Sequence, residues 1–552
     1  MIHHAAFAST CAATLSVASV VFLCYFQRDC SLLSFFASLA GFLCALSIVS
    51  LVPLDIYASV PELNDGDRDA RTALQELWNF LYWVTFWLTW AVCPLLMYYE
   101  DAGGFTWGAR LKTSLIINGR WFLLYLVIGI VGTVLIWSSE EGSWWDFSVV
   151  FKLAIAASNA WGLFLVSTLM GYGLVGVPRT VWQAASYREA LEMNYARAPA
   201  FHEEKVSAMY EVDDIVRDVQ VAVAASSGTS RAEFANQMWH ELEQDPISAE
   251  ACRSFTSMSP SRRQVPVASL EDLALLNWNR IQVMRNARRT SCQWDMLCRS
   301  CWKMSDMLGP RQSQRSRAFS LARFYGYRSM SVLIVLLSVL TFVGEMTMFS
   351  KANTSVFYYY FEWVFGLPWN ADIAQGLVSV PLVFIVCTTY WSVLRIRIAG
   401  FFGLYRRNTD TSILLWCASI LCRLAAPLCY HFLLLGRFQS IGDGVDTEFV
   451  KFMGKIDVIP VLGVLFNEYF PLLVGIQVVV NALNIYPALV RCVGVSSLEF
   501  DFLNSATADP RQGESLVTEA RRGSSPEEAS LQPLAALGSP PHSPPPVGDS
   551  AP

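Results

Sequence analysis

The chain has 552 residues, of which 54% are hydrophobic and 16% are charged, against about 25% charged residues in ordinary soluble domains. The mean hydropathy is +0.37, so surplus apolar surface has to face lipid, and this excludes an ordinary soluble globular protein. The formal net charge is only −6. The positions of the cations along the chain are therefore more informative than their sum.

Nine stretches are apolar and long enough to cross hydrocarbon about 30 Å thick, which needs about 20 helical residues. Five precede and four follow one long charged segment, 178–328. The first stretch has no basic region before it and no cleavage site after it, so we expect a retained helix and not a cleaved signal peptide. The sequence predicts an all-α polytopic membrane protein with a long helical loop between spans five and six. The predicted spans are 5–26, 32–52, 77–98, 121–137, 148–176, 329–349, 376–398, 412–435 and 458–486.

Lysine and arginine lie mostly on one side of these spans, and short cytosolic loops are the ones that carry such an excess. Placing 178–328 in the cytosol places eight further cations there, whereas the four loops on the other side hold only six. We therefore expect the N-terminus outside or in a lumen and the C-terminus in the cytosol. The eight cations are Arg110, Lys112, Arg120, Arg395, Arg397, Arg406, Arg407 and Arg491.

One glycosylation pattern fits this orientation. Asn353-Thr354-Ser355 follows the sixth span, in a loop assigned to the outside, and is an acceptor triplet for N-glycosylation. Such triplets also occur by chance, and the closeness of this one to the membrane counts against its modification.

The cytosolic segment predicts paired amphipathic helices, or a short coiled coil. Apolar residues recur every three or four positions between 177 and 250, and a second helical block covers 270–308. A linker rich in Ser, Pro and Arg, 254–267, separates them. The chain therefore divides into a membrane part (1–177), the cytosolic loop (178–328), a second membrane part (329–486) and a cytosolic tail (487–552).

A basic cluster stands immediately before the sixth span. Juxtamembrane arginines bind anionic lipid at about 1 kcal/mol per charge. The alternative, which we favour, is that they act only as a topology signal. The cluster consists of Arg311, Arg315, Arg317, Arg323 and Arg328.

The tail after about residue 503 has few apolar residues and many prolines, so we expect no packed structure there. Ser525, Ser539 and Ser543 each precede a proline and are candidates for proline-directed phosphorylation.

Motifs for catalysis are missing from the sequence. It has no Walker-type phosphate loop, no His-Glu-x-x-His and no Gly-x-Ser-x-Gly, so we expect neither an enzyme nor a cofactor. Cys292, Cys298 and Cys301 resemble part of a zinc site, but a structural zinc site uses four ligands in paired spacing. Packed or acylated thiols are the favoured interpretation.

Polar residues inside the spans are more informative, because a charge at bilayer depth costs several kcal/mol unless it is paired or hydrated. Lys152 and Glu345 lie near span ends, where we expect them to snorkel. We hypothesise that Arg423 and Glu468 meet between the eighth and ninth spans; the alternative is two separate, hydrated groups. The intramembrane candidates are Arg423, Glu468, Asn467, His431 and Asn159.

Several motifs resemble one known family. They are Val52 to Asp55, Leu77 to Trp83, Ser158 to Leu163, Gly171 to Arg179, Thr409 to Leu415, Cys422 to Leu433 and Met453 to Pro460. They resemble the limb-region and lipocalin-interacting-membrane-receptor family, most closely its domain-containing-protein-two branch. The chain departs from that branch at His431, where asparagine is usual.

The resemblance implies nine helices, an outside N-terminus, a long helical cytosolic loop and no known catalytic residues. Members of the family are linked to lipocalin uptake, to lysosomal cobalamin export and, in the nearest branch, to signalling downstream of G-protein-coupled receptors at the plasma membrane. The plasma membrane is therefore the first expected location, and an endosomal or lysosomal membrane is the second.

Two functions remain open at this point. The first is a receptor-like or scaffold regulator that binds cytosolic or receptor proteins through 178–328, and we favour it. The second is a transporter or channel for a small molecule or lipid, which the prolines and polar groups within the spans favour. The expected partners are the lipid bilayer and other proteins, and no feature points to nucleic acid.

Overall fold

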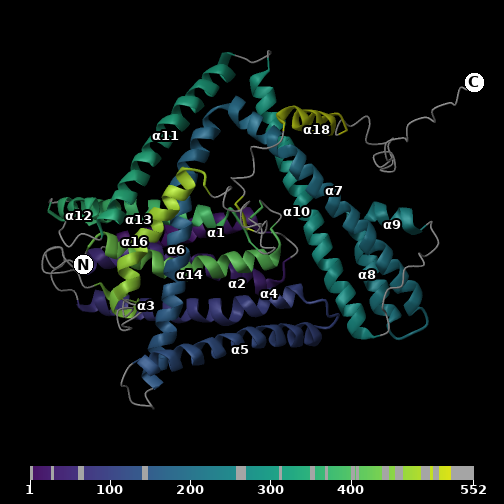
Figure 1. Cartoon of the computed structure of the whole chain (residues 1–552), viewed down its shortest axis with the longest axis horizontal. Helices are drawn as coiled ribbons and strands as arrows, with labels where there is room; N and C mark the ends of the chain where they lie inside the picture. Colours follow the sequence, from purple (N-terminus) through teal and green to yellow (C-terminus); the bar gives the residue numbers. More distant parts are fainter. Residues whose placement is uncertain are drawn as a thin grey trace, which may run out of the picture.

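A computed structural model describes residues 4–26, 30–59, 68–139, 147–256, 269–309, 314–348, 355–366, 371–398, 404–405, 409–437, 447–453, 464–485, 498–500 and 509–523. These residues are helical almost throughout (Figure 1). Short loops join some of the helices, and the strands among the described residues are one antiparallel pair of three residues each, β1 (Ile396–Ile398) and β2 (Leu498–Phe500).

The helices fall into three runs along the chain. The first run is α1 (His4–Tyr25), α2 (Leu32–Ser59), α3 (Arg68–Trp87), the π-helical turn η1 (Leu88–Val92), α4 (Cys93–Asp101), α5 (Trp107–Ser139) and α6 (Phe147–Ala185). The charged segment forms α7 (Tyr187–Ser226), α8 (Ala232–Gln244), α9 (Ala249–Thr256) and α10 (Leu270–Leu308). The last run is α11 (Gln314–Thr347), α12 (Val356–Gly366), α13 (Ala371–Val393), α14 (Thr411–Leu435), α15 (Glu448–Met453), α16 (Val464–Ala482) and α18 (Pro510–Gly523).

Seven helices in the described part of the chain are long and apolar enough to cross a membrane, and each overlaps one predicted span. The other two predicted spans, 5–26 and 458–486, overlap shorter apolar stretches, Ala12–Tyr25 and Pro471–Ala482. The chain is therefore a helical polytopic membrane protein. The seven are Leu32–Ser59, Thr72–Asp101, Trp107–Val131, Gly162–Ala185, Ala318–Thr347, Ile373–Val393 and Thr411–Leu435.

Two helix starts differ clearly from their predictions. The fourth and sixth spans were expected to begin at residues 121 and 329, but α5 begins at Trp107 and α11 begins at Gln314. Arg110, Lys112 and Arg120 lie within α5, because unbranched cationic side chains favour helix and carry their charges to the membrane border. The charged residues therefore show where the apolar surface of the helix ends, while the helix itself continues beyond them.

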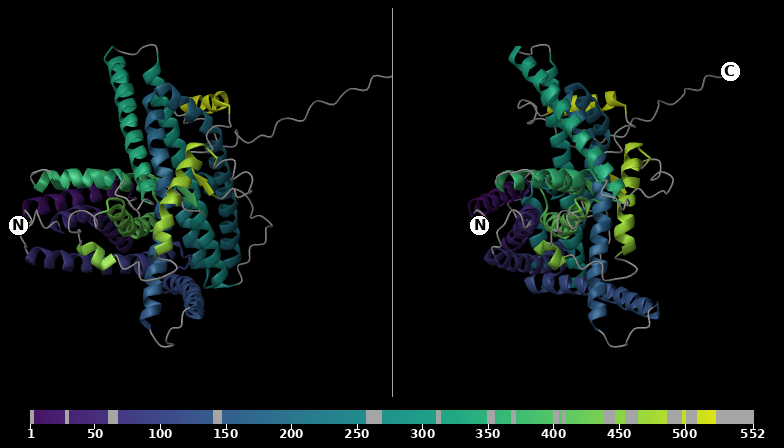
Figure 2. Two further views of the ribbon diagram at one scale, coloured as in Figure 1. Left: turned by 60° about the vertical axis from the view of Figure 1, so that its left-hand side comes forward. Right: turned by 90° about the vertical axis from the view of Figure 1, so that its left-hand side faces the viewer.

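The membrane helices form two groups that run across each other (Figures 1 and 2). In one group α2 packs against α1, α3 and α14, and α14 packs against α4. In the other, α6 packs against α11, α13 and α16. Contacts of α13 with α2 and of α14 with α6 join the groups, and the buried apolar side chains of both belong to one continuous core.

Glycines on α6 allow close packing in the second group. A Cβ added to Gly173 would lie 2.2 Å from the Thr388 carbonyl oxygen of α13, and one added to Gly171 would lie 2.5 Å from Gln477 Cβ of α16. Small residues let helix backbones approach in this way inside membranes. Two further glycines of α6, Gly162 and Gly176, face Pro427 and Trp391.

The charged segment forms an antiparallel hairpin of α7 and α10, with α8 and α9 beside it (Figure 1). The direction follows from the contacts: Asn286 bonds to Glu211, and further along α10 the ring of Trp294 packs on that of His202. Buried side chains of α7, α8 and α10 form an apolar core of their own, separate from the core of the membrane helices.

The helix α18 lies against α7 and α10 near the C-terminal end of α10, from which the chain continues to α11 (Figure 1). No packed structure was expected after about residue 503, and this expectation is wrong for Pro510–Gly523. Val517 is buried, its carbonyl oxygen accepts from Trp302 Nε1 over 3.2 Å, and Gly513 sits directly on the Tyr195 carbonyl. A polar segment with one short apolar face packs here because α7 and α10 provide the surface.

We expect Gly173→Ala to lower the thermal stability of the purified protein, because overpacking a close contact costs about 1–3 kcal/mol. Gly119→Ala on α5 is the control, since nothing lies within 4 Å of a Cβ at that position, and alanine favours helix. The measurement is the midpoint of thermal unfolding in detergent. Equal midpoints for the two variants would contradict the close packing of α6 on α13.

Candidate functional site

Arg423 lies at the midpoint of the 25-residue α14, about 18 Å of helix from either end. Its Nη2 donates to the Thr89 carbonyl oxygen over 2.9 Å. Thr89 belongs to η1, where the Cys93 amide reaches back to the Leu88 carbonyl oxygen. In a π-helical turn the amide of each residue bonds to the carbonyl oxygen five residues earlier. The residue five places after Thr89 is Pro94, which has no N–H to donate. Arg423 therefore supplies the donor that is missing at this helix break.

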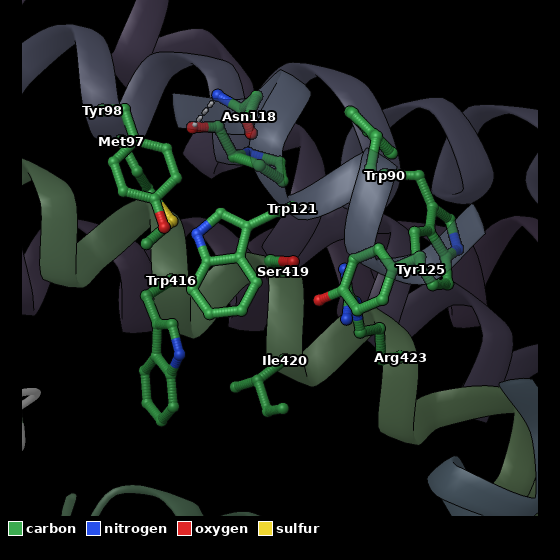
Figure 3. A pocket seen from close by; sticks show the side chains of 12 residues that line it. Trp90, Met97, Tyr98, Asn118, Trp121, Tyr125, Trp416, Ser419, Ile420 and Arg423 are labelled. Carbon is green, nitrogen blue, oxygen red and sulfur yellow. Dashed lines mark hydrogen bonds between the residues drawn. The ribbon is translucent and has the colours of Figure 1, made fainter. Parts of the chain in front are cut away.

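Arg423 also borders a cavity of about 250 Å³ between η1, α4, α5 and α14. Figure 3 shows its guanidinium beside the ring of Tyr125 at one end of the lining, with Tyr98 and Trp416 at the other end. The guanidinium carbon lies 4.6 Å from the centre of the Trp90 ring, which is a cation–π distance. The lining residues are Trp90, Pro94, Met97 and Tyr98 from η1 and α4, Asn118, Trp121, Phe122 and Tyr125 from α5, and Trp416, Ser419, Ile420 and Arg423 from α14.

The cavity carries a positive charge without a described counter-charge. The titratable neighbours of Arg423 in the described residues are Tyr125, Cys93 and Cys422, none of which is a carboxylate. Its Nε is buried and has no hydrogen-bond partner in the same part of the chain. The side chain of Glu468 lies outside the described residues, so its pairing with Arg423 stays a prediction.

A second polar pair lies inside the membrane helices. His431 Nε2 of α14 is 2.6 Å from Glu345 Oε1 of α11, and the two side chains are 1% and 0% exposed. Glu345 was expected to snorkel to the membrane border, and this expectation is wrong, because α11 turns the carboxylate towards α14 and His431 meets it there. The position of Glu345 near the end of a predicted span did not show whether its carboxylate is buried or reaches the membrane border.

The hairpin of α7 and α10 is attached to the membrane helices through Arg285 of α10. Arg285 forms ion pairs with Asp101 at the end of α4 and with Asp410 before α14, the latter over 3.0 Å, and donates to the Glu100 carbonyl oxygen. Burial alone lowers the pKa of Arg285, but Asp410 and Asp101 together raise this pKa above its ordinary value. Burial raises the pKa of Asp410, and Arg285 opposes that rise. The guanidinium therefore stays charged and holds two carboxylates from different helices.

Two further contacts lie along the same helix, eight residues to either side of Arg285. Asn277 donates to the Gly103 carbonyl oxygen over 2.8 Å, and Gln293 donates to the Tyr405 hydroxyl. Gly103 packs directly against the backbone of α10, since a Cβ there would lie 2.0 Å from the Ala274 carbonyl oxygen. One line of polar residues thus holds α10 to the membrane helices over much of its length.

Two cysteines of α10, Cys298 and Cys301, are buried in the interface with α7 and α18. Burial raises the pKa of these thiols to about 11 and about 12. No cluster of three or more metal-ligating side chains is present in the part of the chain that the structure describes.

The comparisons with known proteins agree with the motifs. Residues 4–486 match the profile of the LMBR1-like membrane proteins. The chain belongs to this family. The family resemblance inferred from the motifs is thereby confirmed.

Curated relatives of this LMBR1-like protein match most of its length. The LMBR1 domain-containing protein 2 homolog of Drosophila melanogaster is 28% identical over 72% of this chain and 62% of the relative, so the chain spans less than two thirds of that protein. The G-protein coupled receptor-associated protein LMBRD2 of Xenopus laevis is 25% identical over 82% of this chain and 68% of the relative. The human protein of the same name is 24% identical over 81% and 68%. No solved structure matches the chain.

Two of the motifs typical of the LMBR1-like proteins meet at Asp55. This carboxylate, from the motif 52–55, accepts from Trp78 Nε1 over 3.0 Å and from the Glu448 and Phe449 amides over 3.1 and 2.7 Å. Trp78 belongs to the motif 77–83, and the two amides begin α15, which leads into the motif 453–460. Asp55 therefore caps α15 and ties it to α2 and α3. In the sequence, Asp55 is a carboxylate at the end of an apolar span, but no role was predicted for it.

The described members of the basic cluster, Arg323 and Arg328, contact groups of the protein, and lipid binding by the cluster stays a prediction. Arg323 donates to the Ala184 carbonyl oxygen and lies over the Tyr187 ring at 4.0 Å. Arg328 pairs with Glu189 and lies over the Trp182 ring at 3.6 Å, with its side chain 16% exposed. Both arginines are held at the junction of α6 and α7 because aromatic faces and acceptors are available there.

Other predicted sites fall outside the described residues and stay predictions. This applies to Asn353, Arg311, Ser525, Ser539 and Ser543, and to the side chains of Asn159, Asn467, Glu468, Arg315 and Arg317.

We expect Arg285→Ala to weaken the attachment of α10 by about 2 kcal/mol, because removing one member of a mostly buried ion pair strands the others, and partial exposure reduces the loss. The measurement is hydrogen exchange of residues 270–308 in the purified protein, where protection should fall. Arg217→Ala is the control, since its pair with Asp214 is 46% and 57% exposed and contributes little. Unchanged protection in Arg285→Ala would contradict the attachment.

We expect Trp78→Phe to lower the free energy of unfolding by about 1–2 kcal/mol, because it removes the indole donor from buried Asp55. Trp87→Phe, on the same helix at a half-exposed position, should change stability by less than about 0.5 kcal/mol. Thermal unfolding of both variants in detergent measures the difference. A larger loss in Trp87→Phe would show that Asp55 does not depend on the indole.

Proposed function

We propose that this LMBR1-like protein is a non-enzymatic, receptor-associated scaffold that regulates G-protein-coupled receptor signalling or membrane trafficking through the helices of 178–328. The name of the Xenopus and human relatives, G-protein coupled receptor-associated protein, supports a receptor as the partner. A hairpin with its own apolar core, held to the membrane helices by Arg285, provides a stable surface for such a partner.

The observation that carries the proposal is an exposed stripe on α7, which meets α10 at Glu211 through its bond to Asn286. Within it, Val206 and Tyr210 are 37% and 62% exposed and lie one turn apart. Residues 203–218 contain six acidic and two basic side chains. An apolar pair inside an acidic surface suits a partner helix with apolar anchors and flanking lysine or arginine, such as a membrane-proximal cytosolic segment of a receptor. The acidic stripe consists of Glu203, Val206, Tyr210, Glu211 and Asp214.

The same proposal includes the topology. Nine spans, five before and four after the hairpin, place the N-terminus outside and the hairpin and C-terminus in the cytosol, in line with the distribution of lysine and arginine. We propose the plasma membrane first and an endosomal or lysosomal membrane second. Neither catalysis nor nucleic-acid binding is part of the proposal.

A transporter or channel is the second candidate function. The observation in its favour is the cavity at Arg423, which lies among membrane helices beside a π-helical turn and a proline. π-helical turns inside helices are frequent at functional sites, and a few polar groups in an apolar cavity are typical of small-ligand sites. The two candidates place the essential residues at different ends of the molecule, so one experiment separates them.

The experiment measures resonance energy transfer in cells between the tagged chain and a panel of tagged G-protein-coupled receptors, with receptor-stimulated cyclic AMP as the second readout. Val206→Ser combined with Tyr210→Ser should weaken association about tenfold, as loss of interface anchors does. Met296→Ser combined with Leu308→Ser is the matched control, because these two are exposed apolar residues of α10.

Arg423→Gln provides the opposite comparison. A scaffold should keep its receptor association and signalling effect in Arg423→Gln at equal surface expression. Full association in the acidic-stripe variant, together with loss of the signalling effect in Arg423→Gln, would overturn the scaffold and favour the transporter.

A further inference from the structure

We propose that the Arg423 cavity is a binding site for the anionic head of an amphiphile: a single carboxylate or phosphate on an apolar body. The proposal is independent of the scaffold function, because it concerns the membrane helices and not the acidic stripe. It rests on the charge, the walls, the opening and the size of the cavity.

The first observation is the positive charge of Arg423. A guanidinium at the midpoint of an apolar helix is costly without a partner anion. Arg423 uses one nitrogen on the Thr89 carbonyl oxygen, while its buried Nε has no hydrogen-bond partner among the described residues. The guanidinium therefore retains donors for a ligand, and planar guanidinium favours carboxylate and phosphate oxygens.

The walls are apolar and aromatic with few polar groups. Trp121 and Tyr125 of α5 stack with their ring centres 6.5 Å apart, and Tyr125 also contacts Trp90. Ser419 lies one turn before Arg423 on the same face of α14 and adds a hydroxyl to the lining. A few placed polar groups in an apolar pocket are typical of small-ligand sites.

The cavity opens on the side of α5. Trp121, Phe122 and Tyr125 line it and are each about half exposed. α5 packs mainly on α4, and most of its apolar residues are exposed, as expected for a lipid-facing helix. A ligand therefore reaches Arg423 from the bilayer and leaves its apolar body between lipid and α5.

The size limits what enters. A volume of 250 Å³ equals that of about eight liquid water molecules and lies below the range of pockets that enclose a whole drug-sized ligand. The cavity therefore holds a head and the first few carbons of a chain. A zwitterionic head such as phosphocholine adds a cation that Arg423 repels, so the ligand carries a net negative head.

The test uses the full chain in nanodiscs of phosphatidylcholine. The probe is an oleic acid analogue with a diazirine and an alkyne, which is crosslinked by light and mapped by mass spectrometry. We expect crosslinks in α4, α5 and α14 that oleate competes away and oleyl alcohol does not. Dioleoyl phosphatidate added to the discs distinguishes the sources: competition by phosphatidate assigns the head to a membrane phospholipid, and competition by oleate alone assigns it to a free acid.

The variants assign the interaction to Arg423. Arg423→Gln should reduce specific labelling about tenfold, the usual effect of losing a charge-assisted hydrogen bond. Arg437→Gln is the matched control, because this arginine caps the same helix and binds the Thr347 carbonyl outside the cavity. Ser419→Leu fills the cavity and keeps the Arg423–Thr89 bond, so it separates lost binding from lost folding and should also abolish labelling.

Two results would overturn the proposal. One is labelling that oleyl alcohol competes as well as oleate, or that persists in both Arg423→Gln and Ser419→Leu. The other is a native chain without specific labelling that becomes labelled in Glu468→Gln, because Glu468 would then be the anion that Arg423 binds.

Discussion

Helix ends and helix breaks leave backbone groups without intrahelical partners, and in a chain that faces lipid water does not supply them. Here side chains from other helices bind many of these backbone groups, and the resulting hydrogen bonds hold particular helices together. Arg423 of α14 donates to the break in η1, and Asp55 of α2 accepts from the amides that begin α15. Further donors to carbonyls at or near helix ends are Arg285 to Glu100, Arg323 to Ala184, Arg437 to Thr347 and Ser355 to Leu435.

The short helix α4 connects the two regions to which we assign functions. Pro94, Met97 and Tyr98 line the Arg423 cavity, and Glu100 and Asp101 at the end of the same nine-residue helix bind Arg285 of the hairpin. A ligand in the cavity and a partner on the hairpin would therefore contact elements that share one rigid helix. The extra residue in the turn η1 shifts the helical register between α3 and α4, and α4 contacts both α14 and α5.

The hairpin is stabilised differently from the membrane helices. Its apolar residues are buried between α7, α8 and α10, so the hydrophobic effect in water stabilises it, and its charged residues remain available for partners. Inside the membrane helices that effect is weak, and close approach at glycines together with polar pairs such as His431 with Glu345 takes its place. α18 adds a third element to the hairpin through a small apolar face and an ion pair of Arg521 with Asp306.

The sequence alone determined the class of protein, the approximate positions of the apolar helices, the helical block at 270–308 and the family. These follow from local composition, from periodicity and from ordered motifs, all of which are readable along the chain. The tertiary structure decided where the isolated polar groups go. Arg423 meets a carbonyl of η1, Glu345 is buried on His431, and α18 packs although its composition predicts no core. The physical reason is that a buried polar group takes whichever partner the packing of distant helices brings within about 3 Å, and that packing depends on shape complementarity between helices far apart in the sequence.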